Sequence, residues 1–188
     1  MSALKEIQIH SRRELDIYMN PQRQRILKCM DLNGIAMTPK QISVVLGISA
    51  SSVTFHLKKL EELELVELDH TETIRGICAK FYKRVPATIC LNGGVQDDLC
   101  TEKEALMDYL MNDIWRDFQQ YLHSTEMPSN TELAGDMISG VCYLDEEAVR
   151  TLKHFMWEFQ KKYSKPRENA AAWEVALLAF PGNRDDNQ

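Results

Sequence analysis

The sequence predicts a mainly α (α+β) fold, in which three short helices and a two-stranded hairpin are followed by a helical C-terminal region. Two observations support this prediction. Helix start and stop signals recur between residues 20 and 63. Beyond Leu63 the spacing of apolar residues changes from the period of a helix to the alternation of a strand. A hydrophobic content of 44% is sufficient for a packed core.

The first helix is expected between Asn20 and Gly34. Asparagine is a preferred N-cap residue, and proline, here Pro21, is favoured at the first helical position. Glycine is the commonest residue just past a helix end, which places the C-terminus near Asn33. Four residues of this helix are expected in the core: Ile26, Leu27, Cys29 and Met30.

The second helix is expected to start at Thr38, because a glutamine three residues later completes a capping box. It is short, since Gly47 ends it. Ser49 then caps a third helix that continues to Leu63. Two short helices joined by so tight a turn are the signature of a helix-turn-helix. The expected inner face of the second helix consists of Ile42, Val45 and Leu46.

A two-stranded hairpin is predicted after the third helix. Apolar and polar residues alternate from Val66 onward, and the second strand ends near Val85. Between the strands a polar tip is expected over Asp69–Gly76. Three helices followed by a hairpin form the winged variant of the helix-turn-helix, so residues 1–86 are predicted to be a winged helix-turn-helix domain.

Residues 87–188 are predicted to form a second, helical region. A connection with a turn at Asn92–Gly94 leads into it. A capping box at Thr101 opens a long amphipathic helix that reaches Leu122. Irregular structure over residues 124–142, with a loop at 128–130, separates it from a helix that starts at residues 145–147 and ends before residue 166. Residues 173–180 fit a helix by their alanines or a strand by their alternation.

The C-terminal helices carry apolar stripes that fit a dimer interface or the ordinary core of the region. A mixed set of aromatic and methionine side chains there also suits a pocket for a small apolar effector, although core packing is the more usual role. The two stripes consist of Leu106, Leu110, Ile114, Trp115, Phe118 and Leu122, and of Val149, Leu152, Phe155, Met156, Phe159 and Tyr163. The effector set adds Met107, Tyr109, Met111, Tyr121 and Trp157 to Trp115, Phe118, Phe155 and Met156.

Charge is distributed unevenly along the chain. Residues 1–85 contain 13 Lys and Arg against 10 Asp and Glu, whereas residues 86–188 contain 9 against 18. This division also arises by chance, but it suggests that only the N-terminal half approaches a polyanion.

The third helix has the pattern of a DNA recognition helix. At about 100° per residue, Val53, Leu57 and Leu60 share a narrow inner arc, and His56 lies near its buried edge. Hydroxyls, an aromatic ring and lysines on the outside suit base edges and phosphates. Lysines are also ordinary on a solvated face, but solvent gives no reason for an exposed phenylalanine. The residues expected to contact DNA are Ser49, Ser51, Ser52, Thr54, Phe55, Lys58 and Lys59 of this helix and Arg75 of the hairpin. The alternative for the hairpin is a plain surface hairpin that does not contact DNA.

Several segments resemble the ArsR-type winged helix-turn-helix regulators. "MNPQRQRIL" resembles their opening helix, and "TPKQISVVLGISASSVTFHLKKLEELELVE" is similar to their helix-turn-helix. "AKFYKRV" looks like the end of their wing, and "WEVALLAFP" resembles a tail found in longer members. The core resemblance covers residues 15–86.

This resemblance implies a homodimeric bacterial transcription regulator that binds a palindromic or nearly palindromic operator. It also implies that dimerisation uses the first helix and the C-terminal helices. Many members sense metals through cysteines in the recognition region, but residues 40–63 contain no cysteine. Metal sensing is therefore not expected here.

Other functional classes have little support in the sequence. No Gly-rich phosphate loop, G-x-S-x-G or H-E-x-x-H motif occurs, so neither an enzyme nor a bound cofactor is expected. The five cysteines have no metal-ligand spacing. No apolar run approaches the roughly 18–20 residues needed to span a bilayer, and the N-terminus lacks the apolar stretch of a signal peptide. Both observations favour a cytoplasmic location. The alternative is a winged-helix protein-interaction module that does not bind DNA.

Overall fold

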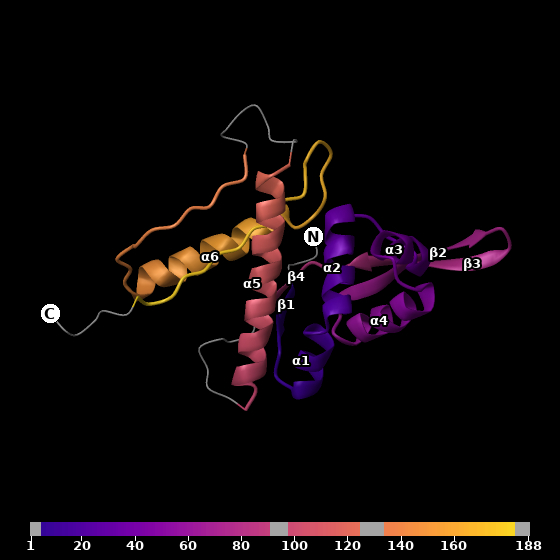
Figure 1. Ribbon diagram of the computed structural model, residues 1–188, viewed down its shortest axis with the longest axis horizontal. Coiled ribbons are helices and arrows are strands. Elements are labelled where there is room, and N and C mark those ends of the chain that lie inside the picture. Colours follow the sequence, from indigo (N-terminus) through magenta and orange to yellow (C-terminus); the bar gives the residue numbers. More distant parts are fainter. Residues whose placement is uncertain (1–4, 91–97, 125–133, 183–188) are drawn as a thin grey trace. The chain divides into compact units, whose positions relative to one another are not determined.

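A computed structural model of the chain describes residues 5–90, 98–124 and 134–182 (Figure 1). The chain divides into two compact units, of which the first comprises Met1–Leu110 and Lys161–Ala172 and the second comprises Met111–Gln160 and Trp173–Gln188. The predicted turn at Asn92–Gly94 and the predicted loop at 128–130 lie outside the described residues. The domain boundary at residues 86 and 87 stays a prediction.

The first unit contains the predicted helix-turn-helix, formed by α2 (Pro21–Asn33), α3 (Pro39–Leu46) and α4 (Ala50–Glu62). All three predicted N-caps are confirmed. The Asn20 side chain accepts hydrogen bonds from two backbone N–H groups of α2, and Thr38 forms a reciprocal capping box with Gln41. Gly34 and Gly47 end their helices with left-handed φ values of 65° and 67°, which glycine adopts without strain.

The predicted hairpin is the wing, formed by β2 (Val66–Ile74) and β3 (Ile77–Arg84) as an antiparallel pair that projects beyond the helices (Figure 1). The predicted broad polar tip over Asp69–Gly76 is wrong. The strands continue to a two-residue turn, in which Arg75 and Gly76 have φ values of 50° and 79°. Both faces of the hairpin are solvated near its end, so the alternation that would have revealed these strands is missing.

Three elements of the first unit were not predicted. Strand β1 (Lys5–Gln8) pairs in parallel with β4 (Ala87–Cys90), so the segment before the helices joins the segment after the wing. Helix α1 (Arg12–Tyr18) lies between β1 and α2 and starts with a capping box of Ser11 and Glu14. A serine followed three residues later by a glutamate is the sequence pattern of a capping box, so this helix start could have been predicted.

The core of the first unit lies between the helices and the base of the wing. The start of helix α5 (Cys100–Leu122) contributes Leu106 to it. The predicted inward position of Val45 is wrong, because its side chain is 59% exposed. Ser43 takes the inner position instead, and its hydroxyl donates to the Lys40 carbonyl oxygen (2.7 Å), which permits its burial. The fully buried side chains include Leu15, Ile26, Ile42, Val53, Leu57, Leu60 and Leu65.

The long helix α5 (Cys100–Leu122) continues from the first unit into the second, and α6 (Glu146–Tyr163) belongs mainly to the second. Helix α5 starts at Cys100, so the prediction of Thr101 as its N-cap is wrong. The α6 start is confirmed, since the Asp145 carboxylate accepts from the Ala148 N–H (2.8 Å). Residues 173–180 form neither the helix nor the strand that their pattern allowed.

The predicted mainly α fold with a winged helix-turn-helix and a helical C-terminal region is confirmed. The second unit, however, buries none of its described side chains. Of the two predicted apolar stripes, only Leu106, which lies in the first unit, is buried. None of the described helices combines the length and the apolar character that crossing a membrane requires.

Candidate nucleic-acid interface

The outer face of α4, which we define as Ser51, Phe55 and Lys58, is exposed as the helical spacing predicted. The opposite side of the helix is anchored by three fully buried residues: Val53, Leu57 and Leu60. Phe55 remains 55% exposed although it is a large apolar side chain. An apolar ring held out from a rigid helix is suited to contact with another surface, such as a thymine methyl group.

The hydroxyls at the amino end of α4 have different local roles. Ser49 is the N-cap, and its Oγ accepts from the Ser52 N–H (3.1 Å) and lies 3.0 Å from the Ser51 Oγ. The Thr54 hydroxyl donates to the Ala50 carbonyl oxygen (2.8 Å). Ser49 therefore caps the helix, and the Thr54 hydroxyl is occupied by the backbone of its own helix, whereas Ser51 is exposed at the positively polarised amino end.

The two adjacent lysines of α4 differ in their surroundings. Lys58 is exposed, and none of the described acidic residues forms an ion pair with it. Lys59 points to the side of the helix, where its Nζ lies 2.6 Å from an Oε of Glu62. Of the two, Lys58 is thus the better placed to meet a phosphate.

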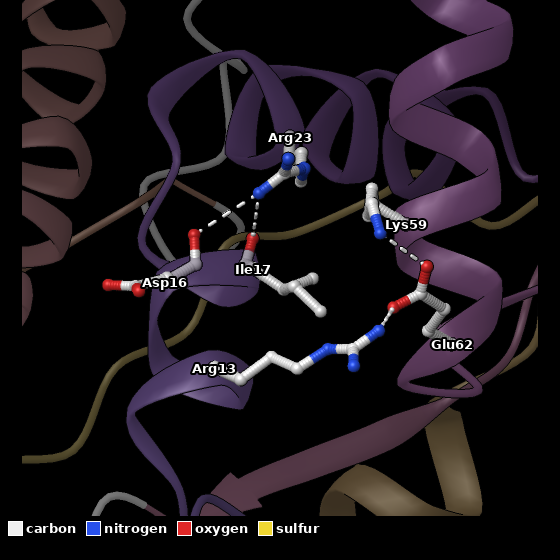
Figure 2. Close-up of polar contacts among 6 residues, drawn as sticks. All are labelled: Arg13, Asp16, Ile17, Arg23, Lys59 and Glu62. Atoms are coloured by element: carbon white, nitrogen blue, oxygen red, sulfur yellow. Dashed lines mark hydrogen bonds and ion pairs between the residues drawn. The ribbon is translucent and has the colours of Figure 1, made fainter.

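Glu62 bridges α4 to α1, as Figure 2 shows. One carboxylate oxygen accepts from Lys59, and the other accepts from the Arg13 guanidinium (2.8 Å). The hydrogen bonds from Lys59 and Arg13 lower the pKa of Glu62. The carboxylate is therefore ionised near neutral pH, and it fixes the carboxyl end of α4 beside α1.

Arg23 of α2 and His56 of α4 are both buried. The Arg23 Nη1 donates to the carbonyl oxygens of Asp16 (3.1 Å) and Ile17 (3.0 Å), which caps the carboxyl end of α1 (Figure 2). Within the described residues, the Arg23 Nε and the His56 Nδ1 have no hydrogen-bond partner. Burial, with a smaller contribution from the Arg23 charge, lowers the pKa of His56. The predicted place of His56 at the buried margin is confirmed.

Arg75 occupies the tip of the wing in a left-handed conformation that costs a non-glycine residue about 1 kcal/mol or more. Most other basic groups of the wing have partners within the protein. Lys83 pairs with Asp69 (2.8 Å), the Arg84 Nη1 donates to the carbonyl oxygen of Leu65 (2.8 Å), and His70 stacks on a ring of the opposite strand. Arg75 and Lys80 remain exposed on the wing, and of the two Arg75 lies at its tip.

The exposure of several large apolar side chains was not predicted from the sequence. Val44 and Val45 are exposed on α3, and Ile74 and Ile77 flank the wing tip as a cross-strand pair. Their exposure follows from which face of a short helix or hairpin meets the core, and the sequence alone does not specify that choice. Across the described ranges, no group of three or more His, Cys, Asp and Glu side chains is arranged to hold a metal ion.

Residues 19–67 match a family model described as winged helix-turn-helix DNA-binding. The matched segment runs from the N-cap region of α2 to the first residues of β2, and therefore contains the outer face of α4. This part of the chain is a winged helix-turn-helix domain of the DNA-binding type. Among curated proteins, no sequence matches the chain.

Three solved structures illustrate what the chain is similar to. One is a possible transcriptional regulator from Methanosarcina mazei Go1, with 14% identity over 56% of this chain and 81% of that chain and a TM-score of 0.33. The adhesin competence repressor from Streptococcus pyogenes has 11% identity over 79% of this chain and 83% of that chain, with a TM-score of 0.32. The heme sensor PefR from Streptococcus agalactiae, in complex with heme, has 17% identity over 80% of each chain with a TM-score of 0.32.

Proposed function

We propose that the chain is a sequence-specific DNA-binding transcriptional regulator of the ArsR type, acting in the bacterial cytoplasm. The observation that carries the proposal is the outer face of α4, where a serine, an exposed aromatic ring and a lysine that has no ion pair among the described residues lie opposite three fully buried side chains. The match of residues 19–67 to a DNA-binding family supports it.

In this proposal the residues of the interface have distinct roles. Phe55 contacts a base edge, with a thymine methyl as its preferred partner, and Ser51 and Ser52 bond to bases or phosphates. Lys58 neutralises a phosphate or reads a guanine edge. Arg75 follows the backbone or enters the minor groove beside the recognition helix. Ser49, Thr54 and Lys59 contribute less than the sequence suggested, because Ser49 caps α4, the Thr54 hydroxyl donates to the Ala50 carbonyl oxygen and Lys59 is paired with Glu62.

We also propose that the regulator is a homodimer on a pseudo-palindromic operator. The second unit exposes several large apolar side chains and buries none among its described residues, so it gains stability by covering that surface with a second copy. Two-fold symmetry then places two α4 helices in successive major grooves, about one helical turn apart. The exposed side chains include Trp115, Leu122, Phe155, Phe159, Trp173 and Phe180.

A small apolar ligand is proposed as the effector, bound in the second unit. An open depression of about 620 Å³ lies along the amino-terminal half of α6, and Leu152 and Phe155 are among the residues that line it. Phe155 is a member of the predicted effector set. A ligand there would act on DNA binding only through its different affinities for the DNA-bound and free forms.

A second candidate function is a protein-interaction module. The exposed Val44 and Val45 on α3 favour it, because a protein-binding surface is usually richer in exposed apolar residues than a DNA-binding one.

Gel-shift assays with DNA that contains the protein's own promoter distinguish the two functions. The regulator binds with an affinity that falls steeply as salt rises, and Lys58→Ala lowers the slope of log affinity against log salt by about one. Glu64→Ala, which removes an exposed charge beyond the carboxyl end of α4, is the control and keeps that slope. A folded protein that shifts no DNA even at low salt would rule out the regulator and leave the protein-interaction module.

A further inference from the structure

A depression of about 450 Å³ lies in the first unit where α1, the amino end of α2 and the carboxyl-terminal half of α4 meet. Four cationic residues line it, with one carboxylate, that of Asp16. We refer to it as the basic depression. Its four cationic residues are Arg12, Arg13, Arg23 and Lys59. None of the three residues of the outer face of α4 lines it.

Three of the four cations of the basic depression stand in positions that cost free energy unless an anion is close. Arg12 and Arg13 are the first two residues of α1, where the helix dipole disfavours positive charge. Arg23 is only 8% exposed, and burial lowers its pKa. Its Nη1 is bonded to two carbonyl oxygens, but its buried Nε has no partner among the described residues. Asn20, the N-cap of α2, adds the positive end of a second helix dipole.

The carboxylates now beside these cations leave room for a further anion. Glu62 binds Arg13 and Lys59, and Glu102 binds Arg12 (3.0 Å). The side chains of Arg12 and Arg13 nevertheless remain 71% and 76% exposed. Glu62 is itself the last residue of α4, where the dipole disfavours a carboxylate. It therefore resembles an internal substitute for a ligand that carries more negative charge.

We infer that the basic depression is a binding site for a phosphate group. Arginine guanidinium groups match a phosphate with two parallel hydrogen bonds, and a lysine adds a point charge. The phosphate replaces Glu62 as the partner of Arg13 and Lys59 and thereby loosens the bridge between α1 and α4. The phosphate group belongs either to a small phosphorylated molecule or to the DNA backbone beside the operator.

Titration of the full chain with inorganic phosphate, at constant ionic strength and followed by calorimetry, tests the site. Lys59→Gln weakens phosphate binding by about tenfold, the effect of one charge-assisted hydrogen bond. Lys153→Gln is the control, because it removes the same charge from an exposed residue of α6 that does not line the basic depression, and it leaves phosphate binding unchanged. Glu62→Gln strengthens binding by a few-fold, since it removes the competing carboxylate. Thermal melts check that each variant remains folded.

The second arm measures DNA affinity against salt for the same variants. If free phosphate binds and follows this pattern, the ligand is a small phosphorylated molecule. If free phosphate does not bind but Lys59→Gln lowers the salt slope by about one and Glu62→Gln raises affinity, the phosphate belongs to DNA. The inference is overturned if folded Lys59→Gln and Glu62→Gln behave as the wild type in both arms. If the wild-type protein binds phosphate but does not bind DNA, the proposed function is wrong and the phosphate site stands.

Discussion

Replacement of Arg75 by asparagine is expected to stabilise the protein, because the backbone at the wing tip is strained. Arg75 and Gly76 are the central residues of the turn between β2 and β3, with φ values of 50° and 79°. The left-handed region costs an ordinary residue about 1 kcal/mol or more, whereas asparagine tolerates it and Asn-Gly is the preferred pair in such turns. The free energy of unfolding should therefore rise by about 1 kcal/mol.

Urea denaturation measures this change. For a denaturant slope of about 1–3 kcal/mol/M, the midpoint rises by roughly 0.3–1 M. Arg75→Ala is the matched control, since it removes the same charge but keeps a side chain that disfavours a positive φ. If the asparagine and alanine variants unfold at the same urea concentration, the reasoning about strain is wrong. In the proposed regulator both variants lose DNA affinity equally, so the strained arginine would be retained for its charge.

Two further predictions concern α4. The lowered pKa of His56 means that the unfolded chain binds a proton more readily than the folded one, so stability is complete above about pH 6.5 and falls as the pH decreases below that value. Chemical denaturation at several pH values should show this loss of stability. His56→Gln should make the loss smaller. His123→Gln, the control, changes a residue just past the end of α5 and should leave the loss unchanged. Leu57→Ala removes a fully buried side chain and should lower the free energy of unfolding by about 2–5 kcal/mol. A loss below about 1 kcal/mol would mean that α4 does not pack as described.

The helix-turn-helix could be predicted from the sequence because its signals are local. Asn20, Thr38 and Ser49 cap helices through hydrogen bonds to residues two or three positions away, and Gly34 and Gly47 end helices through their own backbone conformation. The burial pattern of α4 followed from its helical period, since its apolar residues define only one face.

Features that depend on distant partners could not be predicted. Strand β1 is four residues long, and its partner β4 lies about eighty residues further along the chain, so no local pattern identifies the pair. The apolar residues of α3 allow two inner faces, and packing against α4 selects the one that excludes Val45. The stripes of α5 and α6 were recognisable, but periodicity does not reveal what covers a stripe.

The candidate site was predicted more completely than its electrostatics. Ser51, Phe55 and Lys58 are exposed together as their spacing required. The separation of Lys58 from Lys59 was missed, because it depends on Glu62 and on Arg13 of the unpredicted α1. The basic depression was missed for the same reason.

The parallel pairing of β1 with β4 has a practical consequence for any study of the isolated domain. Backbone hydrogen bonds between these strands close the chain into a loop that starts at Lys5, contains the whole helix-turn-helix and wing, and returns at Cys90. A fragment trimmed to residues 19–67, or a fusion that distorts the first eight residues, would open this loop. Such a fragment would lose the pairing of β1 with β4, which holds the segment after the wing beside the segment before α1. Its recognition helix would then be studied in a domain that is less constrained than in the full protein.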